Sequence, residues 1–242
     1  VIALMRRNDA CRMELKKLRI YAPQLKKIIY IGLPAGIQGI MFGLSNVIIQ
    51  SSINSFQSDA ILSGNGAAAN IEGFVLVMMN SFHQASLNYI GQNFGAHKFD
   101  RVKKTFGLSI AYVSLVGLIA GVGTWFLRRT LLSFYITDSP EAIACGALRM
   151  TYICLPYFIY GIVDVITGSM RGLGSSIPPM IISVLGICGI RILWIYTVFH
   201  NPLYHSLDSL YLSYPISWVL TLVAELIVFI ILFKRKVNTY QQ

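Results

Sequence analysis

Apolar residues in this chain fall into six long runs, separated by short polar or glycine- and proline-rich connections. Each run is near or above the roughly 20 residues that a helix needs to cross a bilayer. The predicted spans are Ile28–Phe56, Gly66–Ile90, Thr105–Leu127, Ile143–Gly168, Pro178–His200 and Leu212–Phe233. The pattern predicts an all-α integral membrane protein, built as a bundle of six transmembrane helices.

The composition strengthens this prediction and excludes other classes of protein. Of 242 residues, 55% are hydrophobic and only 12% are charged, whereas a soluble domain carries about 25% charged residues. The sequence has no H-E-x-x-H, G-x-S-x-G or P-loop motif, and its four cysteines form no C-x-x-C pair. We therefore expect no enzyme, no cofactor and no structural metal site.

The positions of the basic residues predict the orientation in the membrane. The formal charge of +10 could by itself indicate a nucleic-acid partner. However, sixteen Lys and Arg lie in the N-terminal tail, after the second and fourth spans, and in the C-terminal tail, and only Arg128 and Arg129 lie in connections on the opposite side. Cytoplasmic connections are enriched in Lys and Arg. We expect a multi-pass protein of the cell membrane with both termini cytoplasmic, the lipid bilayer as a partner and no nucleic acid.

Glycine and proline inside the spans suggest how the helices pack. Gly32 with Gly36 and Gly39 with Gly43 follow the G-x-x-x-G spacing, which lets two helix backbones approach closely in a membrane. We interpret these four glycines as helix-packing positions. Pro156 interrupts the fourth span and is expected to bend it.

Three carboxylates lie within apolar spans: Glu72, Asp164 and Glu225. A charged carboxylate in hydrocarbon costs about 2.5 kcal/mol or more, so such a group faces the bundle interior or a water-filled cavity, or is protonated. A carboxyl group in that setting can bind and release H⁺ near neutral pH, and its oxygens can also hold Na⁺. This is the chemistry of an ion-coupled carrier.

Asp164 is the strongest candidate for ion coupling, with Na⁺ as one possible ligand. Tyr157 and Tyr160 share its helix face at spacings of seven and four residues. Aromatic rings beside a carboxylate suit an organic cation, through cation–π contact and charge pairing. The alternative is a structural ion pair of Asp164 with Arg171 or Arg191.

Glu72 is the second candidate for coupling. Met79 and His83 lie on the same helix face, and methionine adapts to varied ligands, so both are candidates for the substrate cleft. The alternative for Glu72 is an interfacial glutamate that is hydrogen-bonded to a neighbour. His83 alone is more typical of a packed histidine with satisfied hydrogen bonds.

Further polar residues in the spans have two interpretations each. Glu225 is expected to have a structural role, either paired with Arg191 or close to the cytoplasmic interface. Gln38 and Asn46 belong to polar stripes on the first span. These two side chains either line a substrate cleft or hold helices together.

Several motifs occur in a fixed order over nearly the whole chain. They are Gly32-Leu33-Pro34, then Ser81-Phe82-His83-Gln84-Ala85 with Gly91-Gln92-Asn93-Phe94-Gly95-Ala96, then Arg101-Val102-Lys103-Lys104, and finally Asp164 through Gly174 with Pro178-Pro179-Met180. Together they resemble the multidrug and toxic compound extrusion (MATE) family, in the region from its seventh to its twelfth helix.

The resemblance implies that the chain is the C-terminal lobe of a twelve-helix transporter with two six-helix lobes. Residues 1–27 are then the end of the preceding helix and a cytoplasmic linker between lobes, residues 28–233 the membrane lobe, and residues 234–242 a cytoplasmic tail. An N-terminal six-helix lobe is the implied partner. Members of the family exchange H⁺ or Na⁺ for cationic, often aromatic small molecules, by rocking of the two lobes.

The resemblance also implies roles for individual residues. Asp164 falls on the family's helix-ten aspartate, which belongs to a cation site in one subgroup. That subgroup also has a helix-seven glutamate, but the corresponding place here is apolar around Phe42. Glu72 is our candidate replacement. The predicted spans place Glu72 in the outer third of the bilayer and Asp164 toward the inner third, so whether they form one site stays open.

The favoured hypothesis is therefore the C-terminal half of an H⁺- or Na⁺-coupled antiporter that exports organic cations. A second hypothesis is a flippase of the same superfamily for lipid-linked saccharide, which needs basic residues in the cleft; Arg149, Arg171 and Arg191 are the candidates. A third is a membrane receptor or assembly subunit that transports nothing.

Overall fold

The computed structural model describes Met5 and residues 19–241, without the side chains of residues 239–241. The predicted end of a preceding helix and most of the predicted linker lie outside these residues. The helices are α2 (Ala22–Asn54), α3 (Asp59–Gly95), α4 (Phe99–Phe126), α5 (Arg128–Ser133), α6 (Pro140–Cys154), α7 (Tyr157–Gly172), α8 (Ile177–Ser183), the π-helical turn η2 (Val184–Gly189), α9 (Ile190–Trp194), the π-helical turn η3 (Ile195–Phe199), the 3₁₀ turn η4 (Pro202–Tyr204) and α10 (Leu207–Gln241).

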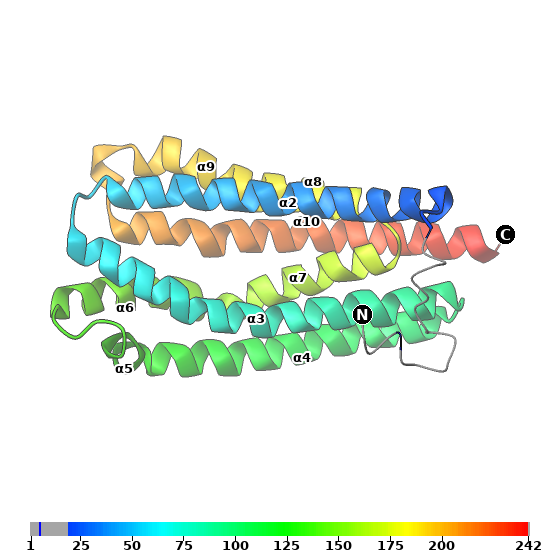
Figure 1. Cartoon of the computed structure of the whole chain (residues 1–242), viewed down its shortest axis with the longest axis horizontal. Coiled ribbons are helices and arrows are strands. Elements are labelled where there is room, and N and C mark those ends of the chain that lie inside the picture. The colour runs from blue at the N-terminus through cyan, green and yellow to red at the C-terminus, as the bar shows by residue number, and fades with distance from the viewer. Residues whose placement is uncertain (1–4, 6–18, 242) are drawn as a thin grey trace.

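The long helices run side by side in an elongated bundle (Figure 1). α3 packs on α4, α6 and α7, while α2 packs on α8 and η2 and has few contacts with α3, its neighbour in the chain. α10 joins the two groups, because it contacts α6 and α7 on one side and α8, η2 and α9 on the other. Because α2 and α3 have few contacts with each other, a ligand pocket is expected between them.

Within the described residues, five helical stretches are long and apolar enough to cross a membrane, and α6 with α7 makes a sixth when the bent pair counts as one span. The prediction of six transmembrane helices is confirmed. The fourth predicted span is broken after Cys154, where Pro156 precedes α7. The axis of α7 is bent by 47° from that of α6. Proline has no backbone N–H to continue the helical ladder, so the expected bend is also confirmed.

The connections are shorter than the apolar runs suggested. The predicted connection Gly91–Lys104 reduces to Ala96-His97-Lys98, and the predicted connection Arg128–Ala142 contains the short helix α5. These predicted boundaries were wrong because hydropathy marks only the apolar part of each helix. The backbone hydrogen bonds of the helix continue into the polar residues at its ends. α3 also begins early, at Asp59, where the Ser58 hydroxyl accepts a hydrogen bond from the Ile61 N–H.

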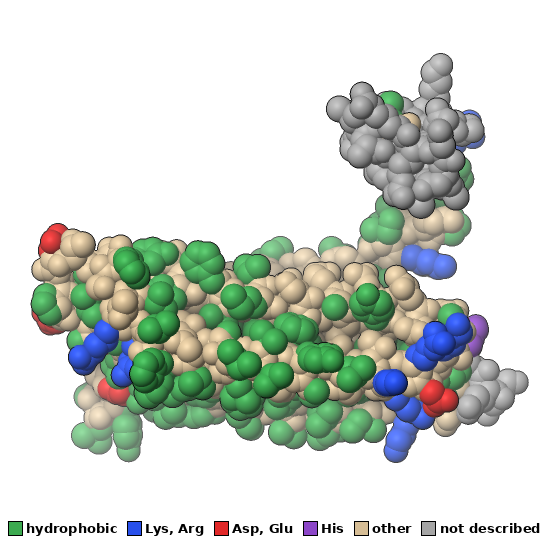
Figure 2. Space-filling view, turned by 90° about the horizontal axis from the view of Figure 1, so that it is seen from below, with side chains coloured by type: hydrophobic (Ala, Val, Ile, Leu, Met, Phe, Trp, Pro, Cys, Tyr) green, Lys and Arg blue, Asp and Glu red, His purple; other side chains and the backbone are tan. Residues whose placement is uncertain are grey.

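The outside of the bundle is rich in exposed apolar side chains. Large hydrophobic side chains are exposed along the helices, for example Ile40, Phe74, Ile119 and Val223. Figure 2 shows such side chains spread along the side of the bundle, with the Lys and Arg that are visible gathered toward its two ends. A soluble protein rarely exposes an apolar surface of this extent, so the chain is a multi-pass membrane protein.

The glycines that allow close helix packing are not the predicted ones. A Cβ added to Gly32, Gly36, Gly39 or Gly43 would meet nothing within 4 Å in the described chain. The packing interpretation of these four glycines is therefore wrong within this lobe. The G-x-x-x-G spacing predicts a helix face without bulky side chains. No described residue of another helix packs closely on these glycines of α2.

The close approaches occur instead around α3, α4, α6 and α7. Added Cβ atoms would stand 2.9 Å from the backbone of Phe158 at Gly117, 2.7 Å from the His83 carbonyl oxygen at Gly168, and 2.8 Å from the Leu87 carbonyl oxygen at Gly172. These contacts hold α7 tightly against α3 and α4.

Gly64 provides a test of this packing. A Cβ there would collide with the backbone of Ala142 and stand 2.9 Å from the Gly146 nitrogen, whereas Gly66, also in α3, has open space beside it. We expect Gly64→Ala to destabilise the complete protein by about 1–3 kcal/mol through overpacking. Gly66→Ala should be neutral or slightly stabilising, because alanine favours the helix. Unfolding in detergent would measure both variants, and equal stabilities would contradict the packing.

Candidate ligand pocket and buried carboxyl groups

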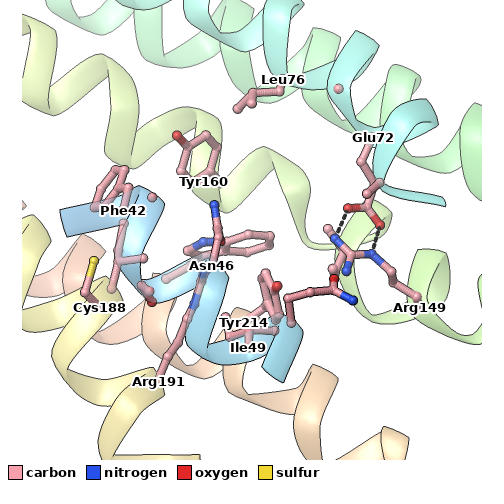
Figure 3. A pocket seen from close by; sticks show the side chains of 18 of the residues that line it. Phe42, Asn46, Ile49, Glu72, Leu76, Arg149, Tyr160, Cys188, Arg191 and Tyr214 are labelled. Carbon is pink, nitrogen blue, oxygen red and sulfur yellow. Dashed lines mark hydrogen bonds and ion pairs between the residues drawn. The ribbon is translucent and has the colours of Figure 1, made fainter. Parts of the chain in front are cut away.

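A pocket of about 630 Å³ opens between α2 and α3 and is closed at the back by α6, α7, α9 and α10. Its volume is in the range of small-molecule sites, about 300–1,000 Å³. Figure 3 shows that its wall combines aromatic rings, such as Phe42, Tyr160 and Tyr214, with charged and amide side chains. The pocket is therefore suited to an amphipathic molecule.

The acidic residue of the pocket is paired. Both carboxylate oxygens of Glu72 accept hydrogen bonds from Arg149, at 2.9 Å from Nε and 2.7 Å from Nη2. The third guanidinium nitrogen, Nη1, donates to Asn65 Oδ1 at 2.6 Å. A bidentate pair of this kind is strong and geometrically specific. Glu72 and Arg149 thus neutralise one another at one end of the pocket (Figure 3).

Arg191 is the other charged residue of the pocket, and it has no acidic partner among the described residues. Its Nε donates to Ser217 Oγ at 3.1 Å. The centre of its guanidinium lies 4.0 Å from the ring centroid of Tyr214 and 5.7 Å from that of Trp218. The side chain is only 5% exposed. Aromatic rings therefore hold this cation in place of a carboxylate.

Asp164 lies on α7 outside the pocket and is bound by His83 of α3. His83 Nδ1 is 2.8 Å from the Asp164 carbonyl oxygen and 2.9 Å from Oδ1. Because the carbonyl oxygen can only accept, Nδ1 carries a proton and donates to both oxygens. The other carboxylate oxygen, Oδ2, is buried without a hydrogen-bond partner in the described structure. One oxygen of this carboxylate therefore makes no hydrogen bond within the described residues.

Glu225 is a buried carboxyl group without a basic partner in the described residues. It is fully buried. Its Oε1 accepts hydrogen bonds from Thr167 at 2.8 Å and Ser183 at 2.7 Å, so it joins α10 to α7 and α8. The expected pairing of Glu225 with Arg191 is wrong, because Arg191 faces Ser217 and Tyr214 instead.

Comparison with known proteins identifies the family. The MatE family model matches residues 34–197, which is more than half of the chain. The chain belongs to the MatE family.

Two curated relatives of this MatE chain are described as probable multidrug resistance proteins. It is 24% identical over 213 residues to the probable multidrug resistance protein YoeA of Bacillus subtilis (strain 168), covering 86% of this chain and 45% of that protein. It is 25% identical over 164 residues to the probable multidrug resistance protein YpnP of the same organism, covering 68% and 36%. The chain thus spans less than half the length of these curated relatives.

The fold agrees with solved MATE structures. The crystal structure of the Vibrio cholerae MATE transporter VcmN in the bent form superposes with a TM-score of 0.81 at 15% sequence identity, covering 93% of this chain and 51% of VcmN. This likeness concerns the fold. It agrees with one six-helix lobe of a larger transporter.

The predicted site residues of this MatE lobe separate into two places. Glu72, Tyr157, Tyr160 and Asn46 line the pocket. Asp164, His83, Gln38 and Met79 are not among its lining residues. Glu72 and Asp164 therefore do not share one site, since the first is bound to Arg149 and the second to His83.

The structure distinguishes between the alternatives for Asp164 and Gln38, and it places Met79 away from the pocket. Asp164 forms no ion pair with Arg171 or Arg191 in the described residues; its partner is His83. Arg171 instead donates to Gln38 Oε1 at 2.7 Å, so Gln38 connects α2 to α7 rather than facing the pocket. Met79 is fully buried. Its Sδ lies 3.4 Å from the position of a Cβ added to Gly117 and 2.7 Å from that of a Cβ added to Gly161, so it packs against α4 and α7.

Other site residues gave only weak signals in the sequence. Asn65 precedes Glu72 by seven residues, the spacing of one helix face, and this could have indicated their shared partner Arg149. Tyr214 and Trp218 are four residues apart in an apolar run, which is equally typical of a packed core. Their role beside Arg191 depends on the approach of α9 to α10.

Proposed function

We propose that this chain is the C-terminal lobe of an ion-coupled MATE exporter, which completes its central cleft together with an N-terminal six-helix lobe. The observation that carries this proposal is Asp164 Oδ2, a buried carboxylate oxygen with no partner among the described residues of a MatE fold. Intramembrane ionisable residues that face the interior mark ion pathways. The multidrug resistance relatives support export as the direction of transport.

Asp164 and His83 would form the coupling centre. The Nδ1 proton of His83 is held by the Asp164 carbonyl oxygen and Oδ1, so Oδ2 is left to take up H⁺ or Na⁺. Thr167 lies one helical turn after Asp164 on α7 and donates a hydrogen bond to Glu225, which would be a second proton-binding group. The coupling role expected for Glu72 requires its ion pair with Arg149 to open.

Ion binding would act on the pocket through α7. Tyr160 lies one turn before Asp164 and lines the pocket with Tyr157. A shift of α7 when Asp164 gains or loses a cation would move both rings. The bend at Pro156 and the π-helical turns η2 and η3 are places where the spans can flex. Rocking of the two lobes would then change the side to which the cleft opens.

We further propose that both termini are cytoplasmic. Lys98 lies between α3 and α4, and Arg101, Lys103 and Lys104 lie in the first two turns of α4, at the same end of the bundle as the C-terminal end of α10 (Figure 1). Lys and Arg favour the cytoplasmic side.

Transport by the complete protein in proteoliposomes tests this function. Vesicles with an imposed H⁺ or Na⁺ gradient should move an aromatic dye against its concentration gradient, and nigericin or monensin, which collapse these gradients, should stop the movement. We would use rhodamine 123, a cation, and fluorescein, an anion. Dye binding without any movement under either gradient would contradict a transporter and favour a receptor or assembly subunit.

A lipid-linked saccharide flippase is the second candidate, favoured by Arg191. Of the three arginines expected in the cleft, Arg149 and Arg191 line the pocket and Arg171 does not. Because Arg149 is paired with Glu72, one open guanidinium is left for a pyrophosphate that carries several negative charges. We therefore place the exporter first.

A further inference from the structure

The charges that line the pocket do not balance. Among the described lining residues, Arg149 and Arg191 are cationic and Glu72 is the one carboxylate. Arginine keeps its proton under all physiological conditions. The lining therefore has one net positive charge, in a wall whose other side chains are aromatic, apolar or polar without charge.

The negative charge of Glu72 is not available to a ligand. Both of its oxygens accept hydrogen bonds from Arg149, whose remaining terminal nitrogen is bound to Asn65. Asn65 is in turn held by Tyr211 and Gln50, with oxygen–oxygen and nitrogen–oxygen distances of 3.3 and 3.1 Å. A ligand that recruited Glu72 would have to break this network.

The positive charge of Arg191, in contrast, is available. Its Nε is bound to Ser217, but no described residue accepts a hydrogen bond from Nη1 or Nη2. Stacking on Tyr214 covers the face of the guanidinium and leaves the N–H groups of its edge free, because these lie in the plane of the group. The Nε1–H of Trp218, which also lines the pocket, is buried without a partner in the described structure. Buried donors without acceptors are costly.

We infer that the pocket binds the anionic group of an aromatic substrate, a carboxylate or a phosphate, through Arg191. The inference rests on the proposed exporter and names its substrate class. The guanidinium edge suits two oxygens of such a group, and Trp218 can donate a further hydrogen bond. Tyr157, Tyr160 and Phe42 supply the aromatic wall for the rest of the molecule.

This inference reverses the charge expected from the sequence. A cation bound in the pocket would lie near Arg191, whereas Asp164 does not line the pocket and is bound to His83. With Glu72 occupied, a cationic ligand would meet an uncompensated positive charge in a poorly solvated space. An anion would meet a partner there.

Two dyes with the same xanthene core and opposite charge provide the test. Binding of fluorescein and of rhodamine 123 to the purified complete protein would be measured by fluorescence anisotropy in detergent, without any ion gradient. We expect fluorescein to bind about tenfold or more tightly than rhodamine 123, as one charge-assisted contact implies. Tighter binding of rhodamine 123 by the unaltered protein would overturn the inference, whatever any variant does.

Variants test whether the preference for fluorescein over rhodamine 123 depends on Arg191. Arg191→Met should weaken fluorescein binding about ten- to a hundredfold and leave rhodamine 123 binding unchanged or stronger, while Arg191→Lys should retain part of the preference. Arg128→Met is the matched control, because Arg128 also lies over a tryptophan ring, at 4.5 Å from the centroid of Trp125, but outside the pocket. Equal fluorescein affinity in Arg191→Met and in the unaltered protein would overturn the assignment.

The source of the anionic group is distinguished in nanodiscs. If phosphatidylglycerol displaces fluorescein and phosphatidylcholine does not, a lipid headgroup supplies the group, whereas no displacement by either lipid supports a soluble aromatic anion. Binding and transport are measured in separate experiments, so failure of the inference and failure of the proposed function can be told apart. Failure of transport would leave the binding preference intact, and a cation preference would leave ion-coupled transport intact.

Discussion

Replacing Asp164 by Asn in the complete protein should abolish ion-driven export while the protein stays folded. Asparagine has the same shape, and its carbonyl oxygen can still accept the hydrogen bond from His83 Nδ1 that holds α7 to α3. It cannot gain or lose a proton at neutral pH, and it has no charge to hold Na⁺. The variant therefore removes coupling without removing the contact.

Initial export rates in proteoliposomes at a fixed gradient, together with the melting temperature in detergent, would separate these effects. Asp100→Asn is the matched control, since the side chain of Asp100 is fully exposed and pairs only with exposed Lys103 at 3.6 Å in the described structure. It should export normally. Undiminished export by Asp164→Asn would refute the role of Asp164, and a large fall in its melting temperature would show that the carboxylate is structural.

Removing one partner of the Glu72–Arg149 pair should destabilise the protein more than any other change considered. Arg149→Met leaves the Glu72 carboxylate buried without its cation, and both side chains are at most 10% exposed. The expected loss is about 3–5 kcal/mol in the free energy of unfolding. Glu72→Gln should cost a comparable amount, because it leaves the guanidinium uncompensated.

A double variant isolates the pair. Since two apolar side chains can replace a buried ion pair at little cost, Glu72→Leu with Arg149→Met should recover most of the loss. Arg129→Met is the control, because Arg129 is exposed and should change stability by less than about 0.5 kcal/mol. Denaturant titration in detergent would measure all four. Additive losses in the double variant would contradict a direct interaction.

Much of the fold was predictable from hydropathy. The six spans, the bend at Pro156 and the membrane class follow from local patterns that do not depend on what a helix touches. The helix ends were not predictable in the same way: α3 continues to Gly95 and α10 to Gln241, beyond the apolar runs. Nor did the spacing of Gly39 and Gly43 reveal that no atom of the described residues lies within 4 Å of a Cβ added at these positions.

The candidate site was predictable only in its components. Glu72, Tyr157 and Tyr160 were identified as site residues and do line the pocket. Their partners could not be read from spacing along one helix. Met79 shows the difficulty well, because it shares a helix face with Glu72 in the sequence, yet lies fully buried against α4 and α7.

The sequence by itself determined that this is a six-span membrane lobe with three carboxylates and two arginines inside its spans, since burial in lipid is a property of each segment. Only the tertiary structure decided which polar and charged side chains are paired. Glu72 and Arg149 are 77 positions apart, His83 and Asp164 are 81, and Thr167 and Glu225 are 58. Such pairs depend on how whole helices pack, and that packing leaves Arg191 facing the pocket with its charge uncompensated.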